Sequence, residues 1–552
     1  MNRQFLWAMM LFLLVISGYN QFVVLPRERA AKAAAEEQLK RAVNQNQSAV
    51  ATVQGAAKIA KAAPSKPEEL ITFNWQDADV TFSSKGAGIK KYTYKDVVED
   101  VDITPFSGEG YFATLPTVDF AESARTQDSI TFTGDVVPGF SVSKTYRFAQ
   151  NGLHTLSLVF ANNTAHDITL EPWAFNFGPG LGTVKSEEGD NERESKAVYL
   201  VQYQGRKKAT LETLKPKGDN PGVYSPAAER AKEKNAPEDE FNWIWAGVQN
   251  RYFLSVIIPQ NWTPGELSAN SHVIGEKDRL WGLFGKGEVK GPQMTVQMPT
   301  VTVEAKAQKE YNSEFYMGPK DYQELLALPY HLDRSIEFGF FGALGKIARR
   351  ILETFFNWTG NYGVAIILLT ICLQVLMFPL TRMSLRSTAQ MRKIGPETKR
   401  LQEKYKGNPE ALNREMLNRE MLNLYKKHGV NPLSGCLPML IQLPIFLALY
   451  NALRTSWALH GAGFMLWITD LSSKDPYYVL PILMGAVMFF QQKGNLPPGT
   501  DPSQAAMFKY MPLIFTLLFM NFPSGLVLYW LTNSLISFGI QTVVNKQVAA
   551  NK

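Results

Sequence analysis

An amide side chain lies near the middle of an apolar stretch of this chain, where a leucine would be cheaper to place in a membrane. The stretch "TICLQVLMFPLTR" (370–382) contains Gln374, and no Asp, Glu, Lys or Arg occurs from Thr354 to Thr381. In a helix, Thr370 and Thr381 would share a face with Gln374, because residues four and seven positions apart lie on the same side. The spacing therefore predicts a polar seam along one face of a membrane-spanning helix.

Uncharged polar side chains recur in the other apolar stretches near the C-terminus. They are Gln442, Gln491, Gln492, Thr516, Asn521, Trp530, Asn533, Ser534, Ser537 and Gln541. A hydrogen bond between two membrane helices stabilises their packing by about 0.6–2 kcal/mol. Such a bond is a sufficient reason for any single one of these polar residues. Polar seams on several spans together favour a shared hydrated cavity, because polar groups inside membranes face the protein interior or water. No Asp or Glu lies in these stretches, which argues against a proton relay or an ion-coupled carboxylate site.

Five segments of the chain contain no charged residue, and four of them hold the polar side chains named above. They are Gln4–Pro26, Thr354–Thr381, Gly429–Leu453, Pro476–Gln492 and Tyr510–Asn545. A bilayer core of about 30 Å is crossed by roughly 20 apolar helical residues. The last segment is too long for one helix and is interrupted by "NFPSG" (521–525), so we expect two helices there. The sequence therefore predicts six spans, one near the N-terminus and five clustered near the C-terminus.

The region between the first two spans has the composition of a water-soluble protein. Residues 27–69 are rich in Ala, Glu, Lys and Gln and predict a linker. From residue 70 to 318, short alternating runs such as "SITFTG" (129–134) and "HTLSLVF" (154–160) predict a large antiparallel β-sandwich. The cysteines of the chain, Cys372 and Cys436, lie outside this region, so it forms no disulfide of its own.

The stretch "FGFFGALGKIARRILETFFNW" (338–358) predicts an amphipathic helix. Its polar face contains Lys346, Arg349, Arg350 and Glu353, while Phe and aliphatic side chains form the opposite face. This pattern is typical of a helix that lies at a membrane surface, and packing against the β-sandwich is the alternative.

Charge predicts the orientation of the chain in the membrane. Twelve Lys and Arg against five Glu lie between Thr381 and His428, and basic loops stay in the cytoplasm. Counting back from this loop places residues 27–350 outside the cytoplasm and both chain ends inside. Arg3 precedes the first span and no small-residue cleavage site follows it, so an uncleaved anchor fits better than a signal peptide.

Motifs for enzymatic chemistry are missing from the sequence. There is no HExxH, no GxSxG and no metal-spaced histidine cluster, and "GLFGKG" (282–287) lacks the Walker spacing and the Ser or Thr. We therefore expect no enzyme, no metal and no cofactor. A small-solute transporter or channel that uses the polar seam is an alternative. Another is an anchored sugar-binding protein that uses the four tryptophans Trp173, Trp243, Trp245 and Trp262, although core packing of these rings is favoured.

Three segments carry a resemblance to a known family. "NPLSGCLPMLIQLPIFLALYNAL" (431–453), "DPYYVLPILMGAVMFFQQK" (475–493) and "FPSGLVLYWLTNSL" (522–535) resemble the YidC/Oxa/Alb family of membrane protein insertases. The large domain ahead of five clustered spans is similar to the Gram-negative form of this family. The resemblance covers essentially the whole chain and is specific through residues 329–545.

The resemblance implies an insertase of the bacterial inner membrane, alone or with the Sec translocon. The implied fold is a five-helix core with a hydrophilic groove open to the cytoplasm and to lipid, an N-terminal anchor helix and a large all-β periplasmic super-sandwich. Implied partners are nascent membrane proteins, the Sec translocon (SecYEG and SecDF), the ribosome, the signal recognition particle receptor and the lipid bilayer, with no nucleic acid as a specific ligand. The resemblance further implies that the basic loop forms a cytoplasmic helical hairpin.

The resemblance also assigns site residues. The family places an arginine in the groove within a pattern TxxxRxxxxPLT, and "LTICLQVLMFPLT" (369–381) has Gln374 at that position. The implied groove residues are Gln374, Thr370, Gln442, Tyr529, Trp530 and Asn533, and Leu443 and Phe446 match the apolar slide beside it. Because the fixed positive charge is missing, we expect Gln374 to hydrate the groove and to bond to peptide.

The sequence predicts the following division of the chain. It comprises an anchor (1–26), a linker (27–69), the β-sandwich (70–318), connecting and interfacial helices (319–358), spans at 359–381, 431–455, 476–493, 509–522 and 525–545, a helical hairpin (382–430) whose first helix covers 383–405, a periplasmic loop (456–475), a cytoplasmic loop (494–508) and a cytoplasmic tail (546–552).

Overall fold

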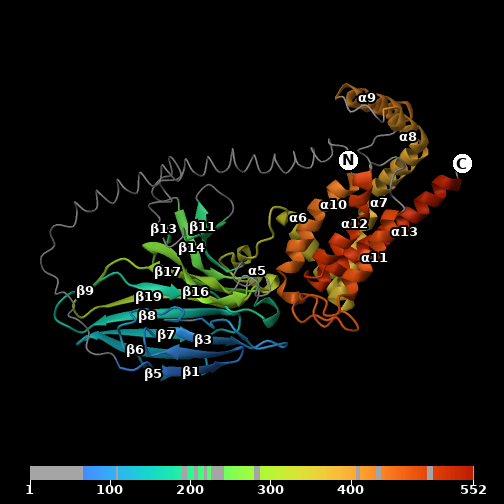
Figure 1. Cartoon of the computed structure of the whole chain (residues 1–552). Helices are drawn as coiled ribbons and strands as arrows, with labels where there is room; N and C mark the ends of the chain where they lie inside the picture. Colours follow the sequence, from blue (N-terminus) through green and yellow to red (C-terminus); the bar gives the residue numbers. More distant parts are fainter. Residues whose placement is uncertain are drawn as a thin grey trace. The chain divides into compact units, whose positions relative to one another are not determined.

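The computed structural model describes residues 66–106, 108, 110–188, 195–203, 209–216, 221–225, 241–278, 286–405, 411–429, 437–493 and 502–550. The expected anchor and nearly all of the expected linker lie outside these residues, as does Cys436. The described chain forms two compact units, one up to Ile336 and one from Glu337 onward. The first contains the described strands and the second the long helices, which confirms the predicted order of a large β domain and a helical membrane core (Figure 1).

Antiparallel sheets build the first unit. The largest sheet has the strand order β12 (Thr210–Leu214), β11 (Lys196–Tyr203), β14 (Phe241–Gln249), β15 (Phe253–Pro259), β19 (Gln308–Pro319), β8 (Leu153–Asn162), β7 (Phe140–Arg147), β6 (Ser129–Val137) and β5 (Ala121–Arg125). A second sheet has the order β1 (Leu70–Trp75), β2 (Ala78–Ser83), β3 (Ile89–Tyr94) and β4 (Val101–Asp102). A third has the order β10 (Ala174–Phe177), β17 (Lys286–Gln297), β16 (Glu266–Asp278) and β13 (Gly222–Tyr224), and β18 (Val301–Val303) pairs with β9 (Ile168–Leu170).

Alternation along the strands places aromatic and aliphatic side chains in the core of this unit. On β8, Leu156, Leu158 and Phe160 are fully buried, while the residues between them are less buried. Successive side chains of a strand point to opposite faces, so one face of the sheet builds the core. The ring of Phe82 on β2 lies 5.1 Å from that of Phe132 and 4.8 Å from that of Tyr146.

The tryptophans of the β unit belong mainly to its interior. Trp173 and Trp245 are buried, which confirms the core-packing interpretation for these two rings. Trp262 donates its indole N–H to the hydroxyl of Ser313 (3.0 Å), and its ring lies 6.2 Å from that of the half-buried Trp243.

Short helices close the β unit. They are η2 (Lys185–Glu187), α5 (Tyr322–Ala327) and η3 (Leu332–Ser335). α5 begins after Asp321, whose carboxylate accepts hydrogen bonds from the backbone N–H groups of Gln323 and Glu324. Such an N-cap pairs donors that the first helical turn leaves without partners.

The second unit consists of helices (Figure 1). They are α6 (Gly342–Thr359), α7 (Tyr362–Lys393), α8 (Gly395–Lys404), α9 (Ala411–Lys427), α10 (Leu437–Arg454), η5 (Trp457–Leu459), α11 (Val479–Lys493), α12 (Pro502–Phe519) and α13 (Ser524–Ala550). α8 and α9 extend beyond the bundle as a continuation of α7 (Figure 1). The end of α13 lies at the same end of the bundle, and the connection between α10 and α11 lies at the opposite end (Figure 1).

The amphipathic prediction for α6 is wrong at one residue. Ile347 and Trp358 expose apolar side chains on this helix, as a surface helix requires. Arg349, which we expected on the polar face, is 1 % exposed and forms an ion pair with Glu353 (3.3 Å). Glu353 also accepts a hydrogen bond from the hydroxyl of Tyr362. The arginine is tolerated in the interior because a carboxylate one helical turn away neutralises it.

The helix boundary expected at residue 381 is also wrong. α7 continues through Thr381 to Lys393, so no separate helix covers 383–405. Pro379 lies inside α7 without ending it, since Pro is tolerated in membrane helices. The helix ends instead before Gly395 and Pro396, because a proline disfavours helical geometry in the residue before it and occupies the first turn of the next helix, α8.

Smaller differences affect the other expected boundaries. α12 already begins at Pro502, inside the expected loop 494–508, and α13 extends to Ala550, inside the expected tail. α11 begins at Val479 and α10 is described from Leu437 onward. The expected boundaries were placed at the ends of the apolar runs. Pro502, a residue favoured at the first position of a helix, was a signal for the earlier start of α12.

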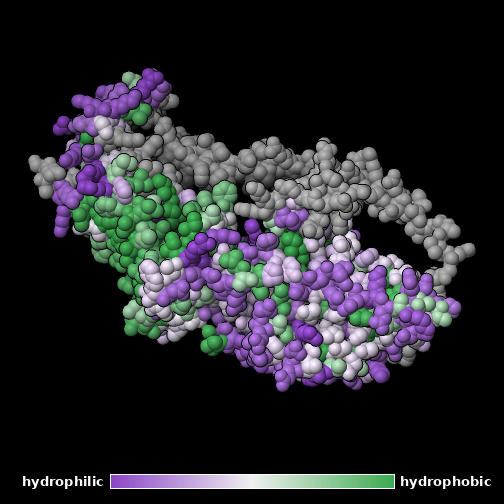
Figure 2. Space-filling model, turned by 180° about the vertical axis from the view of Figure 1, so that it is seen from behind, coloured by the Kyte–Doolittle hydropathy of each residue, from purple (hydrophilic) through white to green (hydrophobic). Residues whose placement is uncertain are grey.

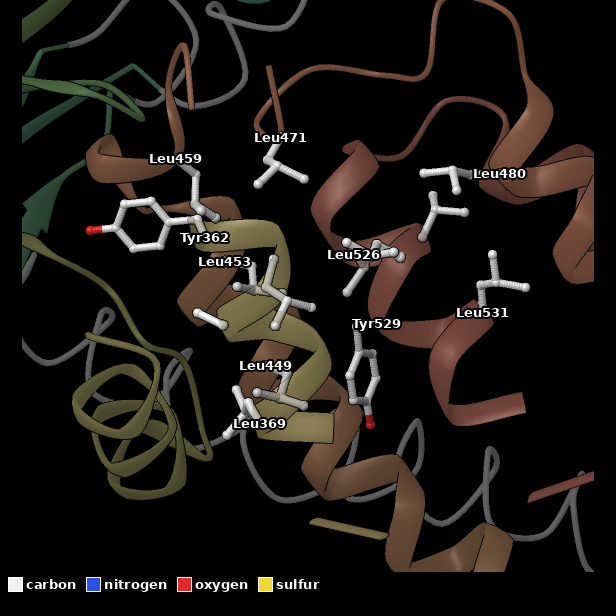
Figure 3. Close-up of a cluster of buried hydrophobic side chains, with 14 of the residues drawn as sticks. Tyr362, Leu369, Leu449, Leu453, Leu459, Leu471, Leu480, Leu526, Tyr529 and Leu531 are labelled. Atoms are coloured by element: carbon white, nitrogen blue, oxygen red, sulfur yellow. The ribbon is translucent and has the colours of Figure 1, made fainter. Parts of the chain in front are cut away.

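The helical bundle has an apolar core and an apolar surface. Figure 3 shows the core, in which leucines of α7, α10, α11 and α13 surround Tyr529. On the outside, Val375 and Leu376 of α7 are each 68 % exposed, and Figure 2 shows a hydrophobic surface over the helices beside the hydrophilic hairpin. By length and hydropathy, 362–391 and 524–547 qualify as membrane spans among the described helices, and 479–492 and 509–519 are shorter apolar helices.

The connection between α10 and α11 forms hydrogen bonds with residues at the N-terminal ends of α7, α11 and α13. Asp475 accepts hydrogen bonds from the backbone N–H groups of Tyr477 and Leu480 and thereby caps α11. Ser524, at the start of α13, donates its hydroxyl to the carbonyl of Ser473. Asn361, before α7, donates its side-chain amide to the carbonyl of Phe464 (3.0 Å). This connection therefore fixes one end of the bundle.

Candidate functional site

Gln374 lies at the contact between α7 and α13. Its Nε2 group donates to Oδ1 of Asn533 and to the hydroxyl of Ser537 (3.1 Å). Asn533 and Ser537 are one turn apart on α13 and therefore lie on the same face of that helix. Gln374 is 7 % exposed, so the amide satisfies its donors within the bundle rather than in lipid.

Gln442 of α10 forms a second polar contact with α13. Its Nε2 donates to the hydroxyl of Tyr529 (2.6 Å). Tyr529 is 1 % exposed, and its ring packs among leucines while its hydroxyl points away from Leu526 (Figure 3). The tyrosine thus contributes its ring to the apolar core and its hydroxyl to a polar contact at the edge of that core.

Thr370 is not part of this polar group. It is fully buried, and its hydroxyl donates to the carbonyl of Ile366 in the preceding turn of α7 (2.7 Å). A hydroxyl bound to its own helix offers little to a second molecule. The shared face that the sequence predicted for Thr370 and Gln374 does not bring the two side chains into one network.

Trp530 and the predicted slide residue Phe446 form an aromatic cluster. The ring of Trp530 stands at 89° to that of Phe446 with centroids 4.8 Å apart, and it lies 5.2 Å from the ring of Phe519 on α12. Leu443, one turn before Phe446 on α10, is 48 % exposed. The structure therefore places Trp530 with apolar partners, beside the exposed leucine, rather than with the amides.

Ser537 and Gln541, which the sequence placed among the polar side chains of the last span, also contact other helices. Ser537 binds Gln374, and Gln541 donates to the carbonyl of Gln491 at the end of α11 (3.2 Å). Both follow Asn533 at intervals of four residues on α13, so helical spacing was the signal for them. Asp475, which caps α11, was missed, although an Asp before an apolar helix is a recognisable N-cap.

The site contains no charge of its own. No Asp, Glu, Lys or Arg occurs in 437–453, 479–492 or 510–545, nor in α7 before Arg382. A charged side chain at the centre of a membrane helix costs about 2.5–3.5 kcal/mol on insertion scales. Within the described ranges, no group of three or more His, Cys, Asp or Glu is placed to hold a metal ion. The site can donate and accept hydrogen bonds but offers neither a nucleophile nor a proton carrier.

The hairpin formed by α8 and α9 carries many of the charged groups of the helical unit. Lys404 of α8 forms an ion pair with Glu420 of α9 (3.0 Å), and the hydroxyl of Tyr405 donates to the same carboxylate (2.8 Å). These hydrogen bonds, first that from Tyr405 and then that from Lys404, lower the pKa of Glu420. His428, after α9, lies 3.3 Å from Glu397 of α8. These contacts hold the two hairpin helices together.

Two family models match the chain. The model described as the 60Kd inner membrane protein matches residues 354–551, and the model described as the YidC periplasmic domain matches residues 114–349. The first match contains α7, α10, α11, α12 and α13 with all candidate site residues, and the second covers most of the β unit and the beginning of α6.

Curated relatives match over most of their length. The chain is 34 % identical to a membrane protein insertase YidC of Endomicrobium trichonymphae, over 87 % of this chain and 86 % of the relative. It is 31 % identical to that of Geobacter metallireducens, over 100 % and 99 % of the two chains. A solved structure of an active YidC insertase with its first transmembrane domain resolved covers 87 % of this chain and 93 % of that chain, with 18 % identity and a TM-score of 0.36.

Proposed function

The chain belongs to the YidC family of membrane protein insertases, and from this premise we propose that the uncharged groups around Gln374 receive the polar flank of a nascent membrane protein. The protein is an inner-membrane insertase with a periplasmic domain, it is not an enzyme, and its substrates are membrane proteins. This identity replaces the alternatives of a transporter or channel and of a sugar-binding protein.

The observation that carries the proposal is the hydrogen bonding of Gln374 to Asn533 and Ser537. A polar flank that crosses hydrocarbon loses its water, and each peptide group or polar side chain left without a partner costs several kcal/mol. Amides and hydroxyls halfway along α7 and α13 shorten the apolar path that such a flank must cross. They do so without a buried positive charge. Such a charge would favour acidic flanks over basic ones.

The apolar part of the substrate leaves the site toward lipid along α10 and α12. Leu443 is exposed on α10, and the aromatic cluster of Phe446 and Trp530 lies next to it. Transfer of roughly 20 apolar residues into hydrocarbon is favourable by the hydrophobic effect and provides the driving force without a nucleotide. In this mechanism Leu443 and Phe446 guide the substrate, while Gln374, Gln442, Tyr529 and Asn533 hydrate or bind its flank.

The proposed topology follows the positive charge of the hairpin. We infer that α8 and α9 lie in the cytoplasm together with both chain ends, and that the connection between α10 and α11 faces the periplasm. A basic cytoplasmic hairpin suits a ribosome with its nascent chain, the signal recognition particle receptor or the Sec translocon as partners. The density of Lys and Arg between Thr381 and His428 supports this assignment.

Substitution of Gln374 tests the proposed site. In proteoliposomes that contain the full chain, Gln374→Leu should slow insertion of a substrate with a polar translocated flank about tenfold, because two hydrogen bonds are lost. Gln374→Arg should be tolerated, because a guanidinium can donate to both Asn533 and Ser537. Val375→Leu, on the exposed face of the same helix, is the matched control and should leave the rate unchanged. Equal rates for Gln374→Leu and the unaltered protein would refute the proposed role.

A further inference from the structure

The contact between Gln374 and Asn533 leaves hydrogen-bonding capacity on both side chains. A glutamine amide has two N–H donors and one carbonyl acceptor, and Gln374 uses its Nε2 group for Asn533 and Ser537. No donor to Oε1 of Gln374 and no acceptor for Nδ2 of Asn533 occurs among the residues that the structure describes. The pair therefore keeps one acceptor and one donor group. Exchanging the oxygen and nitrogen assignments of both amides would again leave one acceptor and one donor group.

The contact between Gln442 and Tyr529 leaves the same combination. Nε2 of Gln442 donates to the tyrosine hydroxyl, which therefore still has its own hydrogen to donate. In the described part of the chain, Oε1 of Gln442 accepts no hydrogen bond and the hydroxyl of Tyr529 finds no acceptor. This second pair also offers one acceptor and one donor.

One acceptor beside one donor is the complement of a backbone peptide group. Every non-proline residue presents one N–H and one C=O, whatever its side chain. A salt bridge or an arginine would select substrates by charge, but a neutral amide pair binds any sequence. The pairs around Gln374 and Gln442 thus match the one feature that all translocated flanks share.

The spacing of the two pairs matches an extended chain. Tyr529, Asn533 and Ser537 follow one another at intervals of four residues on α13, which corresponds to about 6 Å along the helix axis. Residues i and i+2 of an extended chain are about 6.6 Å apart and present their N–H and C=O groups toward the same edge. An extended segment alongside α13 would therefore meet one polar group of the helix for every two of its residues.

We propose that this face of α13, with Gln374 and Gln442 beside it, binds the backbone of the translocating segment in an extended conformation. We name Tyr529, Asn533 and Ser537 the polar ladder. The ligand is a polypeptide backbone, and recognition occurs through its peptide groups at a two-residue period. The proposal rests on the proposed function, because it specifies how the same residues hold the flank. It also accounts for a neutral site in a protein that must accept many substrates.

Backbone esters test this proposal with the unaltered protein. α-Hydroxy acids placed in the translocated flank of a substrate replace an amide by an ester, which removes the N–H donor and keeps the side chains. Each hydrogen bond lost at the polar ladder should slow insertion about two- to fivefold. Esters at positions i and i+2 should slow it more than esters at i and i+1, since only the former face the same edge. An ester is less polar than an amide, so simple partitioning predicts the opposite result, faster insertion.

Variants of the ladder connect the effect to these residues. Asn533→Leu and Gln374→Met keep the side-chain size and remove one of the two pairs, so each should lower the rate ratio of amide to ester substrates severalfold. Thr542→Val is the control, because the Thr542 hydroxyl is exposed on α13 and bonds to the carbonyl of Phe538 in its own helix. This variant should keep the full ratio.

The outcomes separate the two proposals. If ester substrates insert as fast as amide substrates or faster while Gln374→Leu still slows insertion, backbone recognition is refuted and the hydrated site remains. If neither esters nor Gln374→Leu changes the rate, both proposals are refuted. Slowing by esters that is undiminished in Asn533→Leu and Gln374→Met would place backbone recognition elsewhere and would refute the polar ladder.

Discussion

Two polar groups, one in each unit of this protein, differ in how much of their hydrogen-bonding capacity is used. In the β unit, Asn162 is 1 % exposed and uses both ends of its amide. Its Nδ2 donates to the carbonyls of His166, Val303 and Glu304 at 2.8–3.0 Å, and its Oδ1 accepts from the N–H and hydroxyl of Thr164. In the helical unit, Gln374 and Asn533 each satisfy only part of their capacity within the described chain.

A buried lysine of the β unit follows the same rule as Asn162. Lys144 is fully buried on β7, and its ammonium donates to the carbonyls of Gly86 (3.1 Å) and Phe112 and to the hydroxyl of Thr114 (3.3 Å). Burial lowers the pKa of Lys144 well below its usual range. Each hydrogen of the ammonium has an acceptor, so the group serves to hold backbone segments together.

The number of unused donors and acceptors distinguishes polar groups that stabilise the fold from polar groups that can bind a ligand. A saturated amide stabilises its neighbours and has nothing left to offer another molecule. A partly saturated amide in a membrane bundle must find water or a substrate, because lipid supplies no partner. In the proposed function, Asn162 and Lys144 therefore hold segments of the β unit together, while Gln374 and Asn533 of the helical unit contact the passing chain.

The saturated network of Asn162 should show the largest effect on stability. Asn162→Leu removes five hydrogen bonds and leaves buried carbonyls without partners, so the free energy of unfolding of the β unit should fall by about 3–5 kcal/mol. Urea unfolding of the full chain, followed by protease sensitivity of the β unit, measures this change. Asn163→Leu, at the adjacent exposed position, is the control. Insertion below the unfolding transition should not change, and a slowed insertion would contradict the division of roles.

Acidification should weaken the β unit next most strongly. Burial lowers the pKa of His154 on β8 to about 3, while its Nδ1 accepts a hydrogen bond from the N–H of Ala149. Because the unfolded chain takes up this proton below about pH 6.5 and the folded unit does not, stability should fall by about 1.4 kcal/mol per pH unit as the pH decreases from 6.5 toward 3. Urea unfolding at pH 6.5 and pH 5 should differ by about 2 kcal/mol.

A glutamine at position 154 separates this effect from other titrations. His154→Gln keeps an acceptor for the N–H of Ala149 but carries no titrating group. The variant should lose the slope that His154 contributes between pH 5 and 6.5. An unchanged slope would assign the acid sensitivity to other groups of the unit.

Much of the fold followed from the residue pattern, because burial imposes a period. Alternation at 154–160 predicted β8, and charge-free runs predicted the apolar parts of α7, α10 and α13. The end of α7 did not follow, because the charged residues after Thr381 are as compatible with a continued helix as with a new one. The dipeptide at Gly395 and Pro396 was the physical signal for that break.

The candidate site was less accessible to sequence reasoning. Spacing placed Gln374 in a polar seam, but it also placed Thr370 there, because a helical wheel does not show that a hydroxyl bonds to its own backbone. Partners from different helices depend on how the helices pack, so the contacts of Gln374 with Asn533 and of Gln442 with Tyr529 required the structure. The sequence assigned Trp530 to the groove, whereas its neighbours are aromatic rings.

Substitutions that shorten or remove polar side chains on α13 should slow insertion in proportion to the number of hydrogen-bonding groups that they remove. Asn533→Leu removes the acceptor for Gln374 and the open Nδ2 group, so insertion of a polar-flanked substrate should slow about fivefold. Ser537→Ala removes a single bond and should slow it about twofold. A reconstituted insertion assay with initial rates measures both. The reverse order would show that Ser537, rather than the amide pair, is the main contact.

Tyr529→Phe should have the smallest effect on the insertion rate. It tests whether the hydroxyl of Tyr529 has a structural role, like the amide of Asn162. The ring stays in the leucine core, so the stability of the bundle should change little, and only the hydroxyl bound to Gln442 is lost. Gln442 then keeps a free amide that water can reach from the site, so insertion should slow by about twofold or less. A loss of bundle stability by several kcal/mol in thermal unfolding would mean that this hydroxyl is saturated and structural, like the amide of Asn162. The open capacity assigned to the helical unit would then be confined to the pair formed by Gln374 and Asn533.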